Sequence, residues 1–245
     1  MNKVAEAIAG LYIDPQFSGL FRGIKGVEKD GNNFVLKSDG GDLHNIGGLP
    51  VAWDKEIKAK MEPGVAPKLT IESGMKISLP IPNDVAEACG IKNPQEYAIK
   101  EVSLSEPDKS GHRIATVKMD GPVESVSMKV DSRMEPVPID AKGTVQVDAR
   151  LKEGNVGLNL QFNPRELREG KRDQINFKLS VTDKHAQLPD ALEKFLGNTL
   201  DPNLRTILTG IRTFERAGDK ISIGREAATS HEIGGLRVSA AKDIT

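Results

Sequence analysis

The chain has 245 residues, with 34 basic and 35 acidic side chains and a formal net charge of −1. Because the two signs are mixed along the chain, no strong field attracts nucleic acid or an anionic membrane, and we expect no nucleic-acid partner. Aromatic residues make up 4% of the chain. Aliphatic side chains must therefore form the core, and platforms for stacking bases or sugars are scarce.

The single cysteine, Cys89, excludes an internal disulfide framework and a cysteine-based zinc site. We interpret it as a small buried residue rather than a nucleophile. Glu6 lies where a signal peptide would need its apolar region, and no apolar run reaches the roughly 20 residues that span a bilayer. The chain as given is therefore expected to be soluble and without a transmembrane segment, in a compartment that the sequence does not specify.

The first segment of the chain returns at its end. Residues 2–58 align without a gap on residues 189–245, at an offset of 187 residues. The clearest match is Ile-Gly-Gly-Leu, which contains Gly47 and Gly48 in one segment and Gly234 and Gly235 in the other. His44 and His231 stand two residues before these motifs. We predict two copies of one structural unit, either at the two ends of one elongated body or at the starts of successive modules in a longer array. The predicted division is 1–58, 59–187 and 188–245.

Each copy is predicted to open with a pair of short helices. In the second copy, apolar residues three or four apart predict helices at about 189–199 and 202–209. Asp201 is the expected cap, Pro202 the first helical residue and Gly210 the terminator. The first copy keeps these signals at Asp14, Pro15 and Gly23.

A hairpin follows each predicted helix pair. A turn at residues 30–31 places Val27 opposite Phe34, and a turn at residues 217–218 places Phe214 opposite Ile221. The paired glycines are predicted to form a turn or bulge that admits a close backbone approach, because no Lys-Ser or Lys-Thr follows as in a phosphate-binding loop.

Residues 59–187 alternate apolar and polar side chains, which predicts antiparallel strands with one buried face. Mirrored apolar residues predict a hairpin around residues 153–154. Residues 163–168 are predicted to form a capped helical turn. Further strands are expected at 68–72, 75–81, 97–104, 112–119, 123–130 and 174–182. The fold class predicted is α+β and mostly β, with large antiparallel sheets of amphipathic strands and short helix pairs at both chain ends.

No common catalytic motif occurs in the chain, which lacks the nucleotide-binding, α/β-hydrolase and zinc-protease signatures. His44 and His231 share a repeat position, yet one histidine beside a glycine turn lacks the ligand density of a metal site. Asp39 and Asp42 flank two glycines but lack the ligand series of a calcium loop. We expect no metal, no cofactor and no catalytic residue.

Three functional hypotheses remain. The first is a non-catalytic structural or interaction module, part of a larger repetitive protein in one arrangement, with a protein partner. The second is a carrier of an apolar small molecule such as a lipid, in an elongated cavity lined by Leu192, Leu196, Val147 and Leu160. The short helix pair followed by long strands loosely resembles tubular lipid-binding folds, although no motif ties the chain to that family. The third is a hydrolase that uses scattered carboxylates. The oligomeric state is open.

Overall fold

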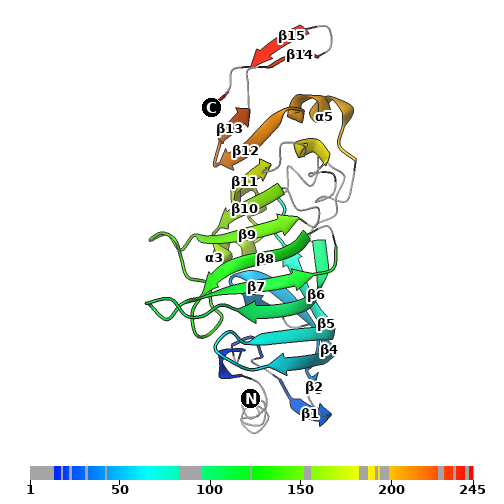
Figure 1. Ribbon diagram of the computed structural model, residues 1–245, viewed down its shortest axis with the longest axis vertical. Helices are drawn as coiled ribbons and strands as arrows, with labels where there is room; N and C mark the ends of the chain where they lie inside the picture. Colours follow the sequence, from blue (N-terminus) through cyan, green and yellow to red (C-terminus); the bar gives the residue numbers. More distant parts are fainter. Residues whose placement is uncertain are drawn as a thin grey trace. The chain divides into compact units, whose positions relative to one another are not determined.

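The computed structural model shows a protein that is mostly β (Figure 1). It describes residues 14–17, 19–21, 24–30, 33–41, 43–82, 95–121, 123–151, 156–181, 187–190, 193, 199–225, 229–233, 236–240 and 243–244. The hydrogen-bonded strand order of the main sheet is β1-β2-β4-β5-β6-β7-β8-β9-β10-β11-β12-β13-β16, with β3 paired to β4. Strands β14 and β15 form a separate two-stranded sheet. The large antiparallel sheet predicted from the alternation is confirmed.

The strand bounds follow. The strands are β1 (Gly26–Asp30), β2 (Asn33–Lys37), β3 (Leu43–Ile46), β4 (Leu49–Glu62), β5 (Lys68–Leu79), β6 (Gln95–Leu104), β7 (Arg113–Met119), β8 (Val123–Val130), β9 (Val145–Leu151), β10 (Val156–Phe162), β11 (Asn176–Val181), β12 (Ile211–Ala217), β13 (Lys220–Arg225), β14 (Thr229–Ile233), β15 (Leu236–Ala240) and β16 (Asp243–Ile244). The helical elements with described bounds are η1 (Pro15–Phe17), α3 (Pro164–Arg168), η2 (Arg172–Gln174) and α5 (Pro202–Leu208).

The predicted helix pairs are not confirmed. In the second segment, residues 188–190 and 193 are helical and α5 follows, but most of the helix predicted at 189–199 lies outside the described residues. In the first segment, η1 is a single 3-10 turn closed by an i to i+3 hydrogen bond, in which the Phe17 amide donates to the carbonyl oxygen of Asp14 at 2.9 Å. Just after this turn the backbone comes close to another loop, since a Cβ on Gly19 would lie 1.8 Å from the carbonyl oxygen of Arg133.

Contacts divide the chain into two compact units. The first comprises residues Met1–Pro80, Pro94–Gly121 and Ser125–Val147, and the second comprises Ile81–Asn93, Pro122–Glu124 and Asp148–Thr245. The predicted division into 1–58, 59–187 and 188–245 came from the sequence repeat. A division by contacts does not test that prediction.

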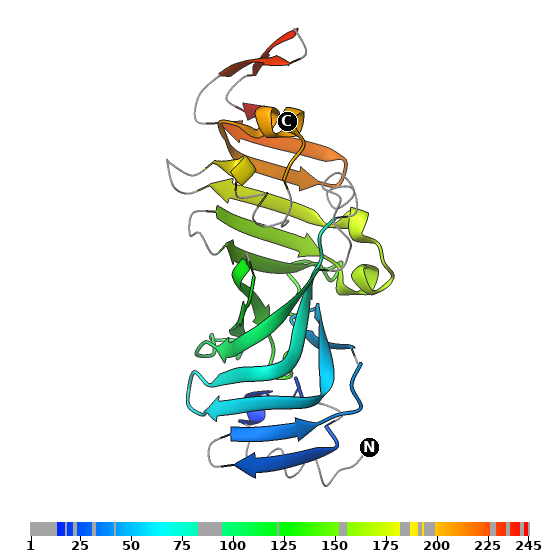
Figure 2. The same cartoon turned by 90° about the vertical axis from the view of Figure 1, so that its right-hand side faces the viewer.

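In the first unit, the long strands β4 and β5 bend along their length (Figure 2). Their register shifts between Trp53 and Ala59, which marks a bulge in the ladder. Gly74 makes the bend possible because it has φ +95°, and a Cβ there would lie 2.2 Å from the carbonyl oxygen of Glu56. The sequence predicted two strands interrupted at residues 73–74, whereas the structure has one strand with a bulge, since Gly74 approaches β4 instead of reversing the chain.

Apolar side chains of these two strands are buried. Trp53 is buried against Phe21, with ring centroids 6.0 Å apart. The other buried residues alternate along each strand, as predicted for β5 but not for most of β4: Leu49, Val51, Ile57, Ala59, Met61, Leu69, Ile71, Met75 and Ile77.

In the second unit, strands β10 to β13 and β16 form consecutive antiparallel pairs, and Leu158, Leu160, Leu179 and Val181 lie on their buried face. The capped turn predicted at 163–168 is confirmed as α3, whose N-cap Asn163 accepts a hydrogen bond from the amide of Arg165 at 2.9 Å.

Candidate interaction surface

The glycine turn of the first segment lies within a packed region. Gly47 and Gly48 have φ of +56° and +90° and connect β3 to β4. A Cβ on Gly47 would lie 2.2 Å from Cγ of Met128, and the Gly47 amide donates to the carbonyl oxygen of Met134 at 3.2 Å. The predicted turn with a close approach is confirmed here. The equivalent Gly234 and Gly235 lie outside the described residues.

The other predicted site residues are distributed as follows. His44 pairs with Val51 across β3 and β4, and His231 pairs with Val238 across β14 and β15; their side chains are not described. Val147 and Leu160 are both buried, at 0% and 2% exposure. Leu192 and Leu196 lie outside the described residues, as does Cys89, so a cavity lined by the four apolar residues stays a prediction.

The carboxylates whose pKa is shifted in the described chain serve structural roles. Hydrogen bonds from Lys129 and from loop amides lower the pKa of Asp108 to about 2, and bonds from Thr144 lower that of Asp140. The pKa of Glu193 is lowered by Arg205 and by the amide of Leu200. A general acid needs the opposite shift, because it must hold its proton near neutral pH. Within the described residues, no group of three His, Cys, Asp or Glu side chains is placed to hold a metal ion.

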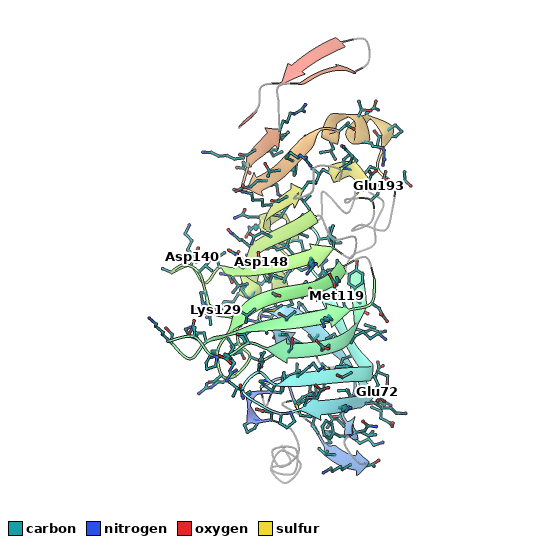
Figure 3. The ribbon with its side chains drawn as sticks, viewed as in Figure 1. Glu72, Met119, Lys129, Asp140, Asp148 and Glu193 are labelled. Carbon is teal, nitrogen blue, oxygen red and sulfur yellow. The ribbon has the colours of Figure 1, made fainter. Side chains whose placement is uncertain are left out.

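Three loops of the first unit share one hydrogen-bonding design. In each, an aspartate Oδ1 accepts from the amides two and four residues later, at 2.8–3.0 Å. The residue three positions after each aspartate has a positive φ; these residues are Gly111, Met134 and Gly143. Figure 3 labels Asp140 in the last of these loops and Lys129, which forms an ion pair with Asp108 at 2.7 Å. These three aspartates are therefore loop caps. The hydrogen bonds they accept contribute to the lowered pKa of Asp108 and of Asp140.

The two segments that align in sequence also share strand register. Eleven residue pairs of the first segment have a counterpart exactly 187 positions later in the second. The five pairs of the β1–β2 hairpin recur in β12–β13, and the four pairs of β3–β4 recur in β14–β15. Two pairs of β2–β4 recur in β13–β16: Leu36↔Ile57 as Ile223↔Ile244, and Lys37↔Glu56 as Gly224↔Asp243. Three separate strand pairings therefore coincide between the ends of the chain.

The hairpin register predicted from the sequence is wrong in both segments, and by the same amount. Val27 pairs with Leu36 rather than Phe34, and Phe214 pairs with Ile223 rather than Ile221. The last pairs of the two hairpins are Asp30↔Asn33 and Ala217↔Lys220, one position later than predicted, and Gly218 takes a positive φ of +62° in the second turn.

The burial of equivalent apolar residues differs between the two hairpins. Phe34 and Leu36 on β2 are 4% and 0% exposed. Their counterparts on β13 are less covered, since Ile221 is 49% exposed and Ile223 is half-buried. Phe34 pairs with Ala59 of β4, whereas among the described strands Ile221 pairs only with Arg216 of β12. Ile221 on β13 is therefore exposed, whereas the equivalent Phe34 on β2 is buried.

An aromatic and basic cluster lies beside this exposed residue. The rings of Phe177 and Phe214 are 5.7 Å apart, and the Arg216 guanidinium lies 5.3 Å from the centre of the Phe177 ring. Arg216 also donates to the carbonyl oxygen of Ile175 at 3.0 Å, which fixes its guanidinium over β11. On the opposite face of the same strands, Lys178 and Glu215 form an ion pair at 3.4 Å.

An ionic clamp holds the preceding helical segments. Arg205 of α5 forms ion pairs with Asp190 and with Glu193, which Figure 3 labels, and Oε1 of Glu193 accepts from the Leu200 amide at 3.0 Å. Leu188, Leu200 and Leu208 beside the clamp are buried. These described leucines therefore belong to packed core.

We call the half-exposed side chains of Phe214, Ile221 and Ile223 the β12–β13 strip. The sequence analysis named Phe214 and Ile221 as paired hairpin positions and did not name Ile223. No signal in the sequence identifies them as exposed, because Ile221 stands where the first segment has a buried phenylalanine.

No helix in the described part of the chain is long and apolar enough to cross a bilayer. Comparison with protein-family models, with curated proteins and with solved structures gives no match.

Proposed function

We propose that the protein is a non-catalytic structural or interaction module built from two copies of one unit, residues 2–58 and 189–245. The observation that carries this proposal is the shared strand register. A one-residue slip would exchange the two faces of every strand, so unrelated hairpins have no reason to agree in all three pairings. Duplicated units of this kind build binding surfaces in repeat proteins.

The β12–β13 strip is the surface through which the module binds a protein partner. Its aliphatic and aromatic side chains lie beside Arg216, a composition typical of interface centres. Its counterpart in the first segment, Phe34 and Leu36, is buried and paired with β4 within the chain, and this burial supports the proposal that a neighbour covers the strip.

Site-specific photo-crosslinking tests this function. A photoreactive phenylalanine analogue replaces Ile221, and in a matched control it replaces Ile114, which is 42% exposed on β7. We expect a discrete crosslinked polypeptide from position 221 in cells of the natural source and none from position 114. Crosslinks of equal pattern at both positions, or none at 221, would contradict the proposal.

An apolar-ligand carrier is the second candidate, and the incompletely covered Ile223 and Phe214 favour it because a lipid chain could also bury them. Native mass spectrometry of gently purified protein separates the two functions. A carrier retains a lipid-sized adduct, whereas an interaction module travels without one and still crosslinks to protein from position 221.

A further inference from the structure

We infer that the connection between β10 and β11 binds a phosphate group, free or carried by another molecule, through Arg165, Arg168 and Arg172. The connection belongs to the second unit and lies between two paired strands in the middle of the chain. It shares no residue with the β12–β13 strip, so the site goes beyond the proposed function.

The connection folds back on itself, which brings η2 beside α3. Gly170 follows α3 with φ +82°, a conformation that reverses the chain. The side-chain nitrogen of Gln174 in η2, with its amide oriented to satisfy both ends, donates to the Glu166 carboxylate of α3 at 3.3 Å. The η2 turn, which begins at Arg172, is therefore held beside α3.

Two of the arginines extend from one side of α3. Arg165 and Arg168 are three residues apart, so their side chains are neighbours on the helix surface, and both are exposed. Nε of Arg168 donates to the carbonyl oxygen of Pro164 at 3.2 Å, which orients its guanidinium. Leu167 is the buried residue of this helix. The two arginines are therefore accessible to a ligand.

Arg172 has a buried donor without an acceptor. Its side chain is half-buried, and Nη1 is shielded from solvent with no hydrogen-bond partner. Burial lowers the pKa of this guanidinium, and no described acid opposes that effect. Because a buried N–H of a charged group is costly without an acceptor, this atom is suited to an anionic oxygen.

Two acidic side chains of the connection are engaged elsewhere. Glu169 forms an ion pair with Lys171 at 2.8 Å, and Glu166 accepts from Gln174. None of the three arginines forms an ion pair with a carboxylate that the structure describes. Their charge is therefore available to an anion from outside the chain.

A group of three arginines suits a phosphate better than a carboxylate. The planar guanidinium presents a fork of N–H donors, and a phosphate dianion has enough oxygens to accept from several forks at once. A half-buried cation also gains more from an anion than an exposed one, because solvent screens it less. The expected ligand is therefore a dianion.

The test uses the full chain, isotope-labelled for NMR and titrated with sodium phosphate at constant ionic strength and mildly alkaline pH. The Nε–H resonance of Arg172 and the amide resonances of α3 and η2 should shift saturably. Acetate should bind about fivefold more weakly, because it carries one charge and two oxygens. Shifts that do not saturate, or equal affinity for acetate, overturn the inference.

Arg172→Gln should weaken phosphate binding about tenfold, because it removes the buried donor fork. Lys171→Gln is the matched control. It removes the same charge one position away, but that ammonium pairs with Glu169, so affinity should change less than about twofold. An equal loss in both variants would mean general charge attraction and overturns the site. If Arg172→Gln does not fold, the exposed Arg168→Gln decides, with a loss of about threefold expected and unchanged affinity as the contrary result.

A blocked phosphoserine tripeptide distinguishes the source of the phosphate. Tighter binding than inorganic phosphate assigns the site to a phosphorylated polypeptide, and weaker binding assigns it to the free anion. Photo-crosslinking from position 221 does not involve these arginines, so the phosphate site and the proposed function succeed or fail separately.

Discussion

Met134 adopts a left-handed backbone conformation, with φ +64°, at a loop position where the two sister loops have glycine. Its side chain is 1% exposed, and its carbonyl oxygen accepts from the Gly47 amide. Burial of the side chain offsets the backbone strain, since a left-handed residue costs about 1–2 kcal/mol while a buried methionine contributes about 2–5 kcal/mol.

Met134→Gly should therefore destabilise the protein by about 1–3 kcal/mol, because the lost burial exceeds the relieved strain. Urea unfolding measures the difference. Gly111→Ala is the matched control, since φ there is +79° and a Cβ meets nothing within 4 Å. It should show the strain alone, about 1 kcal/mol. A Met134→Gly variant more stable than the unaltered protein would show that burial of the methionine side chain does not offset its backbone strain.

Asp108 links loop structure to pH. Its pKa is about 2 in the folded protein, below its usual 3.8, chiefly because Lys129 donates to it. A folded-state pKa below the unfolded value gives stability that is present above about pH 4 and is lost as the pH falls toward 2.

Asp108→Asn should remove this part of the acid dependence. The urea midpoint should fall less steeply between pH 4 and pH 2 in the variant than in the unaltered protein, while both remain flat between pH 5 and pH 7. Parallel acid profiles for the two proteins would mean that the loop opens without affecting global stability.

At the scale of the element, β5 shows what alternation predicts and what it does not. The alternation correctly predicts the apolar residues that become buried on both sides of Gly74, but it cannot separate a turn from a bulge. A bulge forms instead of a turn because the backbone of β4 contacts Gly74. That contact joins residues distant along the chain, which alternation within β5 does not report. The hairpin turns show the same limit, because a one-residue choice of turn position depends on packing of both faces.

Gly74→Ala should therefore strongly destabilise the fold, because the new Cβ would lie 2.2 Å from the carbonyl oxygen of Glu56 and φ is +95°. We expect a loss of more than about 3 kcal/mol or failure to fold, measured by urea unfolding and yield of soluble protein. Gly157→Ala on β10 is the control, since nothing lies within 4 Å of its Cβ. Similar effects at both positions would remove the bulge as the explanation.

At the scale of the whole molecule, the repeated register makes the two hairpins exchangeable in principle. Residues 26–37 and 213–224 have the same length, the same pairing and the same turn position. Strand register is specified wherever one face is buried, so register decides whether a transplanted hairpin fits.

A chimera in which residues 26–37 replace residues 213–224 should fold, with a stability loss of about 1–3 kcal/mol from imperfect packing against β11. The control replaces residues 212–223 with the same segment, which exchanges the two faces of both strands. Circular dichroism and urea unfolding should show cooperative unfolding for the first chimera and none for the second. Equal behaviour of the two would refute the equivalence of the segments.

The sequence by itself determined the antiparallel strands, their buried faces and the capped turns, because period-two alternation and turn residues act between near neighbours. Only the tertiary structure decided the bulge at Gly74, the positions of both hairpin turns, the strained Met134 and the exposure of Ile221. Each of these depends on which distant backbone approaches, or on whether a neighbouring strand is present, and one-dimensional alternation carries neither.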